Sequence, residues 1–415
     1  MKYDRVTLAM LALMLAVIPA SPGKTDPSSG HIRVIGIGES YYPETSFPLL
    51  IRADPRLRYQ PIPANWYEGS FGSVGSGRED VMRFIRQYMP KTYQDFVENY
   101  DVMLLSDFEV DVITPLQFSW MERAVREEGT GLGKYEMNWD PSYFSTFDMF
   151  VSSAVYPALP ASLGSGRSIP TPLEGIEPVP LNLSGRPPGT PHPVVDLPGM
   201  KNYRVLGSGS YGYEIPREGA ITIARFVPRG QDAIIIREYG EGQALTCVPG
   251  LDKIDSASIS DWPFVVDFWI NQMWYLAGED IPEDIEKVHQ LRSDSLTYIN
   301  EKSLAISVIQ FVEKFGATTQ ELYEMMDEVD GIKAESDRLY MEEQYDESLA
   351  KLREAFEGLM RLGESSVKAK ESALFWVYAI EWLAVTGTLT LVGFVLWSLM
   401  VRRKLYREVQ VTRAR

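Results

Sequence analysis

The sequence predicts an α/β domain with a doubly wound, mostly parallel sheet, followed by an all-α stalk and one membrane-spanning helix. Three observations predict this order. Short apolar strand-like segments alternate with amphipathic segments over residues 31–280, which is typical of parallel sheets covered by helices. Residues 281–372 form charged amphipathic helices by pattern, and residues 373–401 form an apolar run with Glu381 as its one charge.

The first half of the α/β domain supplies strands that end in glycine or polar residues. Residues 32–38 and 101–107 are near-continuous apolar runs of the kind that is buried on both faces of a parallel sheet. Thr114 and Pro115 are suited to the N-cap and the first position of a helix, and Gly129 is suited to its C-cap. A second strand is expected at 57–62, and helices are expected at 78–88 and 93–99.

The second half supplies further strands at 220–227, 233–239 and 243–248, of which the last two form a predicted hairpin. An aromatic helix at 264–277 closes the domain. Between the halves, residues 157–198 hold eleven prolines in 42 residues, which excludes a regular helix or a central strand. We interpret this segment as an insertion within one domain, with a domain boundary as the alternative.

Both ends of the chain are predicted to interact with a membrane. Residues 1–23 resemble a secretory signal peptide, with an apolar run at 6–18 that is short for a span and small residues after it. An uncleaved anchor is the alternative. Residues 383–401 carry no charge and are long enough to cross a hydrocarbon core of about 30 Å.

The flanks of the second apolar run predict its orientation. Trp382 and Trp397 suit the two interfacial belts, and Arg402, Arg403 and Lys404 begin a basic tail at 402–415. The positive-inside rule places this tail in the cytoplasm. The expected location is therefore the cell membrane, as a single-pass type I protein with residues 31–372 outside the cytoplasm.

This topology marks two further residues as candidate sites. Glu381 is an ionisable residue inside the apolar run, which marks it as a functional candidate; an interfacial residue that reaches back to water is the favoured alternative. Asn182 begins the sequon Asn-Leu-Ser in the segment expected outside the cytoplasm, so it is a candidate glycosylation site.

Composition excludes several functions. The chain has one cysteine and three widely separated histidines, so we expect no disulfide framework, no metal site and no cofactor. Its net charge of −17 argues against a nucleic-acid partner, because nucleic-acid binding requires clustered basic residues. The expected partners are the membrane, an envelope protein bound through the stalk, and a small ligand or glycan.

The order of several segments resembles the class I glutamine amidotransferase-like superfamily, in particular its membrane-associated branch. These segments are YDVMLLSD at 100–107, TP at 114–115, EGTG at 128–131, HPV at 192–194, YGEGQAL at 239–245 and the aromatic helix at 262–274. The resemblance spans roughly residues 31–280. It implies a flavodoxin-like doubly wound sheet and, in true amidotransferases, a catalytic triad of Cys, His and Glu.

The catalytic residues of that family do not match this chain. The expected nucleophile elbow, at residues 131–138, contains no cysteine, and Cys247 comes after the usual position of the histidine. A thiolate and its histidine base are both needed for amide hydrolysis. The resemblance therefore implies a non-catalytic domain in which Cys247 is a small buried residue.

Acidic residues follow the predicted strands at the sheet edge where open α/β sheets bind ligands. Glu39, Asp107 and Glu136, together with Glu109, could form a carboxylate pocket there. Solvated loop acids and helix caps are the alternative interpretation.

Three functions follow from these patterns. The leading hypothesis is an envelope-anchored, non-catalytic domain that binds an extracytoplasmic ligand or protein partner. The second is a hydrolase of another class that uses the carboxylates of the sheet edge. The third is an accessory subunit of a membrane transporter or surface-layer assembly that binds through the stalk. Residues 339–359 of the stalk resemble one tetratricopeptide-like hairpin, and a three-helix bundle or coiled coil is the plainer alternative.

Overall fold

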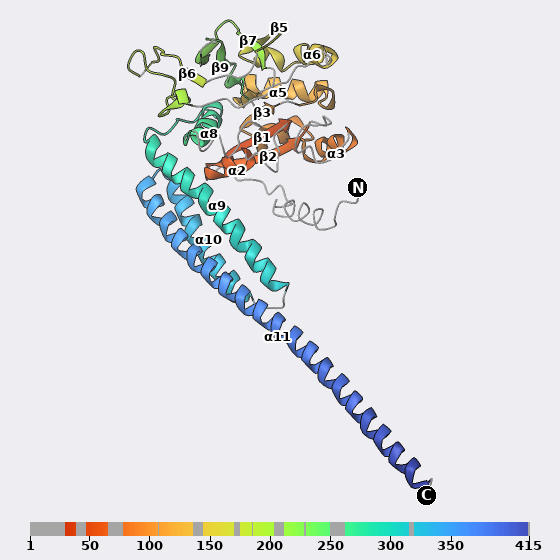
Figure 1. The fold of residues 1–415 in the computed structure, drawn as a ribbon. Helices are drawn as coiled ribbons and strands as arrows, with labels where there is room; N and C mark the ends of the chain where they lie inside the picture. The colour runs from red at the N-terminus through yellow and green to blue at the C-terminus, as the bar shows by residue number, and fades with distance from the viewer. Residues whose placement is uncertain are drawn as a thin grey trace. The chain divides into compact units, whose positions relative to one another are not determined.

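The computed structural model describes residues 30–38, 47–64, 78–106, 108–135, 144–169, 175–184, 186–202, 211–227, 230–249, 262–314 and 319–413. The chain divides into two compact units. The first comprises residues 1–296 together with Tyr340–Tyr345, and the second comprises Thr297–Leu339 and Asp346–Arg415. Figure 1 shows both units and labels many of their elements.

The first unit contains an eight-stranded mixed sheet with the order β2-β1-β3-β4-β10-β9-β8-β6. The pairs from β2 to β10 are parallel, and those from β10 to β6 are antiparallel. The predicted α/β class with a mostly parallel sheet is confirmed. The strands are β1 (Ile32–Gly38), β2 (Leu57–Pro63), β3 (Val102–Ser106), β4 (Gly131–Tyr135), β6 (Gly175–Pro178), β8 (Ile221–Val227), β9 (Asp232–Tyr239) and β10 (Gly242–Cys247).

Helices cover both faces of this sheet because alternate residues of its buried strands point to opposite sides. Ile37, Leu105 and Leu132 contribute to one core, which includes side chains of the helices before and after β3. Tyr135 lies on the other face, with its ring 5.6 Å from that of Trp269 in α8. The helices of this unit are α2 (Phe47–Leu50), α3 (Arg78–Tyr88), α4 (Tyr93–Asn99), α5 (Pro115–Glu128), α6 (Phe144–Val151) and α8 (Val265–Leu276).

Helix α5 begins and ends where its sequence predicts. The Thr114 side chain accepts a hydrogen bond from the backbone N–H of Gln117, and the Gln117 side chain accepts one from the backbone N–H of Thr114. This capping box satisfies two of the amide groups that a helix start leaves unpaired. Gly129 ends the helix at φ 74°, in the left-handed region that glycine adopts without strain.

The contact between β4 and α8 depends on glycine. A Cβ atom on Gly131 would lie 2.1 Å from the carbonyl oxygen of Leu276. On Gly133 it would lie 3.0 Å from the Leu276 side chain. Strand β4 therefore exposes backbone toward α8, and the helix approaches the sheet closely enough to bury nearly all of its side chains.

The proline-rich insertion at 157–198 contains the strands β5 (Ala161–Ile169) and β6. Strand β5 pairs with β7 (Tyr211–Pro216) in a separate two-stranded antiparallel sheet. Strand β6 lies at the edge of the main sheet, where a strand ending in Pro178 is tolerated because its outer N–H groups need no partner.

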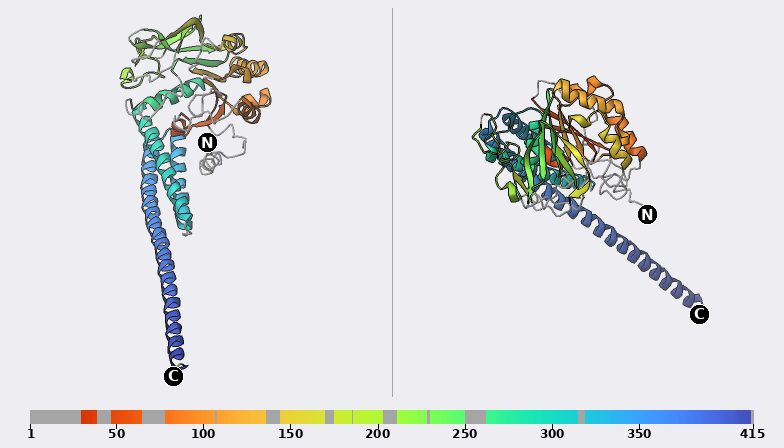
Figure 2. Two further views of the ribbon diagram at one scale, coloured as in Figure 1. Left: turned by 45° about the vertical axis from the view of Figure 1, so that its right-hand side comes forward. Right: turned by 90° about the horizontal axis from the view of Figure 1, so that it is seen from above.

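The second unit is a helical bundle formed by most of α9 (Ile285–Glu313), α10 (Gln320–Met341) and α11 (Tyr345–Arg413). The start of α9 and the turn from Tyr340 to Tyr345 belong to the first unit. Lys302 of α9 binds Asp330 of α10, and Ser336 of α10 binds Ser348 of α11. The Tyr298 ring of α9 lies 6.0 Å from that of Phe356 in α11. Figure 2 shows the three helices side by side, with α11 continuing alone beyond the other two.

Candidate functional site

The structure describes the sheet edge at which the carboxylate pocket is expected, but not the three acids themselves. Glu39, Asp107 and Glu136 directly follow β1, β3 and β4, which are neighbouring parallel strands. All three residues lie outside the described part of the chain. Their convergence into one pocket therefore remains a prediction.

Backbone hydrogen bonds join the described residues at this edge. The N–H of Ala64, after β2, donates to the carbonyl of Gly38, and the N–H of Glu109, after β3, donates to the carbonyl of Ala64. Gly38 has φ 114°, and a Cβ atom there would lie 1.8 Å from the carbonyl oxygen of Ser106. Only glycine fits here, because the ends of β1 and β3 approach each other so closely.

Glu109 is the predicted edge carboxylate that the structure does describe. It is half-buried, and burial raises the pKa of its carboxyl group, with a further upward contribution from Asp111 and an opposing one from Arg78. Arg78, the first residue of α3, forms an ion pair with Asp111. A carboxyl group with a raised pKa at the ligand-binding edge of an α/β sheet is a candidate acid or base.

A buried ion pair lies near the carboxyl end of β4, the strand next to β3. Lys134 of β4 contacts Glu214 of β7, and each side chain is 3% exposed. Thr246 of β10 is the register partner of Lys134. Thr246 Oγ1 and Glu214 Oε2 are buried and have no hydrogen-bond partner among the described residues. Lys134 falls within the expected nucleophile elbow, whose first five residues instead form the strand β4.

Cys247 is poorly suited to nucleophilic chemistry. It ends β10, is fully buried, and its burial raises the pKa of the thiol well above its ordinary value. The reactive form of cysteine is the thiolate, which such a site disfavours. This agrees with the prediction that Cys247 is a small buried residue.

His192, which belongs to the family-like segment HPV, lies in a partly buried aromatic contact. Its ring centroid is 5.2 Å from that of Tyr275, in an edge-to-face arrangement. Burial lowers the pKa of His192 to about 4, and Arg186 adds to the effect. The backbone N–H of Val194 lies 3.3 Å from Nδ1, so this nitrogen is the acceptor in the neutral ring.

Sequence reasoning missed a second, fully buried charge cluster in the first unit. Arg292 of α9 is 0% exposed and binds two carboxylates. Its Nη2 lies 2.8 Å from Asp54 Oδ2, and its Nη1 lies 2.9 Å from Asp267 Oδ1. Burial lowers the pKa of Arg292, whereas Tyr340, Asp54 and Asp267 together raise it above its ordinary value, so the guanidinium stays charged.

Further side chains complete this Arg292 cluster. Trp274 Nε1 and the Tyr340 hydroxyl donate to Asp54 Oδ2 at 3.1 and 2.8 Å. His289 Nδ1 lies 2.6 Å from Asp267 Oδ2. The cluster connects Asp54, which follows the 3-10 turn η2 (Ile51–Ala53), with α8, the start of α9 and the end of α10. We assign it a structural role within the first unit, because buried charges that are paired and hydrogen-bonded fix the relative positions of the residues that supply them.

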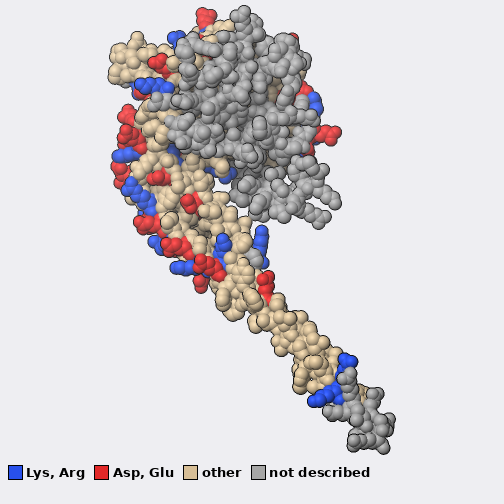
Figure 3. All heavy atoms as spheres, viewed as in Figure 1, with Lys and Arg blue, Asp and Glu red and all other residues tan. Residues whose placement is uncertain are grey.

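The residues predicted to contact the membrane lie on the exposed surface of α11. Trp382 is 70% and Trp397 is 58% exposed, and Glu381, Arg402, Arg403 and Lys404 are exposed as well. Within the described residues, one helix is long and apolar enough to cross a membrane, and it includes this stretch. Figure 3 shows the basic side chains after the apolar part of α11.

The structure also describes the surroundings of Asn182 and the distribution of metal-binding side chains. Asn182 is exposed next to the Leu181–Thr190 bridge, so its side chain is accessible. Among the described residues there is no group of three or more His, Cys, Asp or Glu side chains that could hold a metal ion.

Neither a protein family model nor a curated protein matches this sequence. Among solved structures, the chain is similar to the cytoplasmic protein STM3548 of Salmonella typhimurium at 15% identity and a TM-score of 0.42, over 59% of this chain and 99% of that one. It is also similar to a cold-adapted β-galactosidase from Rahnella sp. R3 at 13% identity and a TM-score of 0.31, over 61% and 33%. At these TM-scores, the similarities determine neither the fold nor the function of this chain.

Proposed function

We propose that this chain is a membrane-anchored protein whose glutamine amidotransferase-like domain binds a ligand or a protein partner outside the cytoplasm. The observation that carries the proposal is the continuity of α11. This single helix of 69 residues runs from the bundle through the apolar residues 373–401 to the basic residues after them. Such a helix would hold the α/β domain at a membrane surface.

The order of the parallel strands supports the flavodoxin-like part of the proposal. Numbered along the chain, the five parallel strands β1, β2, β3, β4 and β10 lie in the order 2-1-3-4-5, which is the flavodoxin-like order. In that fold the ligand crevice opens at the carboxyl ends of the first and third strands. Here these ends are Gly38 and Ser106, next to Glu109.

The burial of Cys247 supports a binding function rather than glutamine hydrolysis. An assay of the purified full-length chain tests this directly. We expect no release of ammonia from glutamine above the uncatalysed rate, and no difference between the native chain and a Cys247→Ala variant. Hydrolysis that is lost in Cys247→Ala would contradict the proposal, as would hydrolysis that survives the substitution, because another nucleophile would then be present.

A second candidate function is favoured by Glu109. Its raised pKa and its position at the sheet edge suit a general acid or base in a hydrolase of another class. This candidate predicts hydrolysis of a model ester or glycoside that falls at least about a hundredfold in Glu109→Gln. A chain that is inert toward both substrate classes would leave only the binding function.

A further inference from the structure

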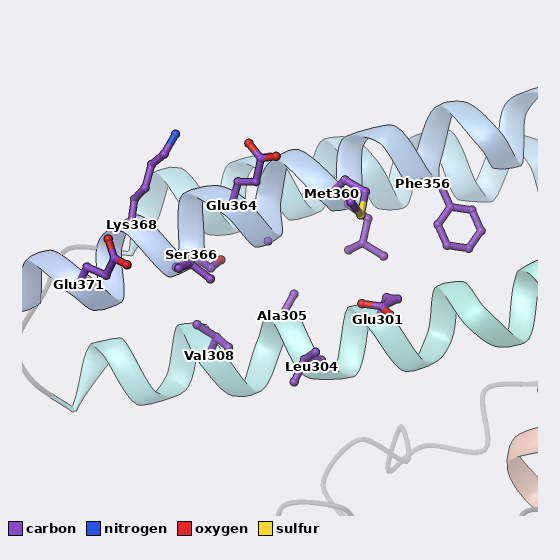
Figure 4. A pocket seen from close by; sticks show the side chains of 13 residues that line it. Glu301, Leu304, Ala305, Val308, Phe356, Met360, Glu364, Ser366, Lys368 and Glu371 are labelled. Carbon is purple, nitrogen blue, oxygen red and sulfur yellow. The ribbon is translucent and has the colours of Figure 1, made fainter. Parts of the chain in front are cut away.

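The second unit contains an open groove between α9 and α11. Its volume is about 530 Å³, and its surface is mostly apolar. Figure 4 shows Leu304, Ala305 and Val308 on α9 and Met360 and Phe356 on α11, the two helices that line this groove. The groove is lined along α11 by residues between Phe356 and Glu371, so it ends two positions before the apolar run begins at Ala373.

Part of the apolar lining of the groove lies outside the packed core of the bundle. Leu304, Met360 and Val367 are 61%, 65% and 49% exposed, whereas Leu359 at the floor of the groove and Leu362 of α11 are buried in the bundle. Helix α11 thus has two apolar stripes, one packed within the bundle and one open. A surface helix needs one apolar stripe to pack against the rest of its domain. A second apolar stripe that is exposed to solvent marks an interaction surface.

The charges on the groove are predominantly acidic. Glu301, Glu364 and Glu371 line it, with Lys368 as the one basic residue among the lining side chains. Within the described part of the chain, no ion pair involves any of these four side chains. An occupant with basic side chains at its edges would therefore match the groove in charge.

The open stripe of α11 continues into the apolar run. Glu381 lies 18 residues after Gly363, which lines the groove. At 3.6 residues per turn this separation is five full turns, so both residues lie on the same side of the helix. A helix seated in the groove and extended along α11 would therefore run beside Glu381. A carboxylate in a membrane span requires a polar or basic partner.

We propose that the groove binds a helix of a second membrane protein. The occupant is apolar toward the groove, carries Lys or Arg opposite Glu301, Glu364 and Glu371, and continues through the bilayer beside Glu381. This inference rests on the membrane anchorage proposed above. A second copy of this chain fits less well, because it would bring three further carboxylates and only one ammonium into the interface.

A defined peptide tests the proposal on the full-length chain in phosphatidylcholine vesicles. The probe is a synthetic helix with a leucine-rich span and an amphipathic extension bearing lysines; the matched control peptide bears glutamates at the same positions. A photoreactive residue replaces Val367 in the groove or, as the control, Arg361, which is exposed and lies about 160° around the helix from Gly363. We expect crosslinking of the lysine peptide at position 367 only, with an affinity roughly tenfold above that of the glutamate peptide.

Charge reversal provides the decisive comparison. Both Glu364 and Glu371 are exposed, so Glu364→Lys combined with Glu371→Lys should leave the bundle folded, as helical circular dichroism would verify. We expect this variant to prefer the glutamate peptide. Equal binding of the two peptides, an unchanged preference after reversal, or crosslinking at position 367 mainly to a second copy would each overturn the proposal.

Anchorage is measured separately in the same vesicles, by resistance of the chain to extraction with alkaline carbonate. A chain that is extracted would overturn both the proposed function and the proposed partner. A chain that resists extraction but binds neither peptide would overturn the partner alone.

Discussion

Single side chains explain why the first unit includes parts of the helical segment. Arg292 lies on α9, yet its guanidinium bonds to Asp54, beside the η2 turn, and to Asp267 on α8. Tyr340, at the end of α10, donates to the same Asp54. Burying charge is costly unless every group is bonded. The Arg292 cluster satisfies this condition by drawing on elements far apart in the sequence.

Replacing Arg292 should therefore be among the most destabilising single substitutions. Arg292→Met leaves the buried carboxylates of Asp54 and Asp267 without their cation, which costs about 3–5 kcal/mol of unfolding free energy. Tyr340→Phe removes one hydrogen bond and should cost about 1 kcal/mol. Urea unfolding of the full chain in detergent measures both. Similar losses in Arg292→Met and in the exposed control Arg353→Met would contradict the assigned role.

His192 should make stability depend on pH. Its pKa is about 4 in the folded chain against an ordinary 6.5. Between these values the unfolded chain binds the extra proton, so the unfolding free energy falls as pH drops from 6.5 to 4. The unfolding free energy that this group contributes is about 3 kcal/mol, and all of it is present above pH 6.5.

A His192→Gln variant isolates this contribution. We expect the difference in unfolding free energy between the native chain and the variant to shrink as pH falls through this window. An NMR titration of His192 should show its midpoint near pH 4. A constant difference across the window, or a midpoint near 6.5, would contradict the burial of this ring.

Much of the chemistry at the level of side chains could not be predicted from the sequence. The Thr114 cap and the buried Cys247 follow from local pattern and composition. The Arg292 cluster does not, because its members are up to 286 positions apart in the chain. One signal was present: Asp267 is an acidic residue within the otherwise apolar segment 264–270. A carboxylate in such a segment needs a buried partner, but local sequence does not say which.

Among the elements, the distance between β4 and α8 is limited by backbone atoms rather than by side chains. Gly131→Ala would place a methyl group 2.1 Å from the Leu276 carbonyl oxygen, which neither the strand nor the helix can avoid without shifting. We expect a loss of about 1–3 kcal/mol in unfolding free energy.

Gly331→Ala is the matched control for this prediction. Gly331 lies within α10, and a Cβ atom there meets open space. The substitution should be neutral or stabilising by up to about 1 kcal/mol, because alanine favours the helix. Urea unfolding compares the two variants, and a Gly131→Ala chain as stable as the native one would contradict the close approach of α8 to β4.

Most elements were predictable because their signals are local. Helices α3 and α4 have the expected bounds, and the β9–β10 hairpin forms at the predicted glycines. The strands β5 and β6 within the proline-rich insertion were not predicted. Their pairing depends on partners such as β8 and β7 rather than on their own sequence, and proline content excludes central strands without excluding edge strands.

For the whole molecule, the chain combines an α/β unit, a helical bundle and one long apolar helix. The helix is exposed over residues whose composition suits a lipid environment, and its basic end suits the cytoplasmic side of a membrane. The proposed function and the proposed partner both depend on this orientation. Orientation is therefore the central claim to test.

Labelling of introduced cysteines in intact cells tests the orientation most directly. The native Cys247 is buried and should not react. Asn182→Cys places a thiol on the exposed α/β surface, and Tyr406→Cys places one beyond the apolar run, where Tyr406 is 74% exposed. With a membrane-impermeant maleimide, we expect labelling at position 182 in intact cells and at position 406 only after lysis. The opposite pattern, or equal labelling of both positions before lysis, would contradict the account.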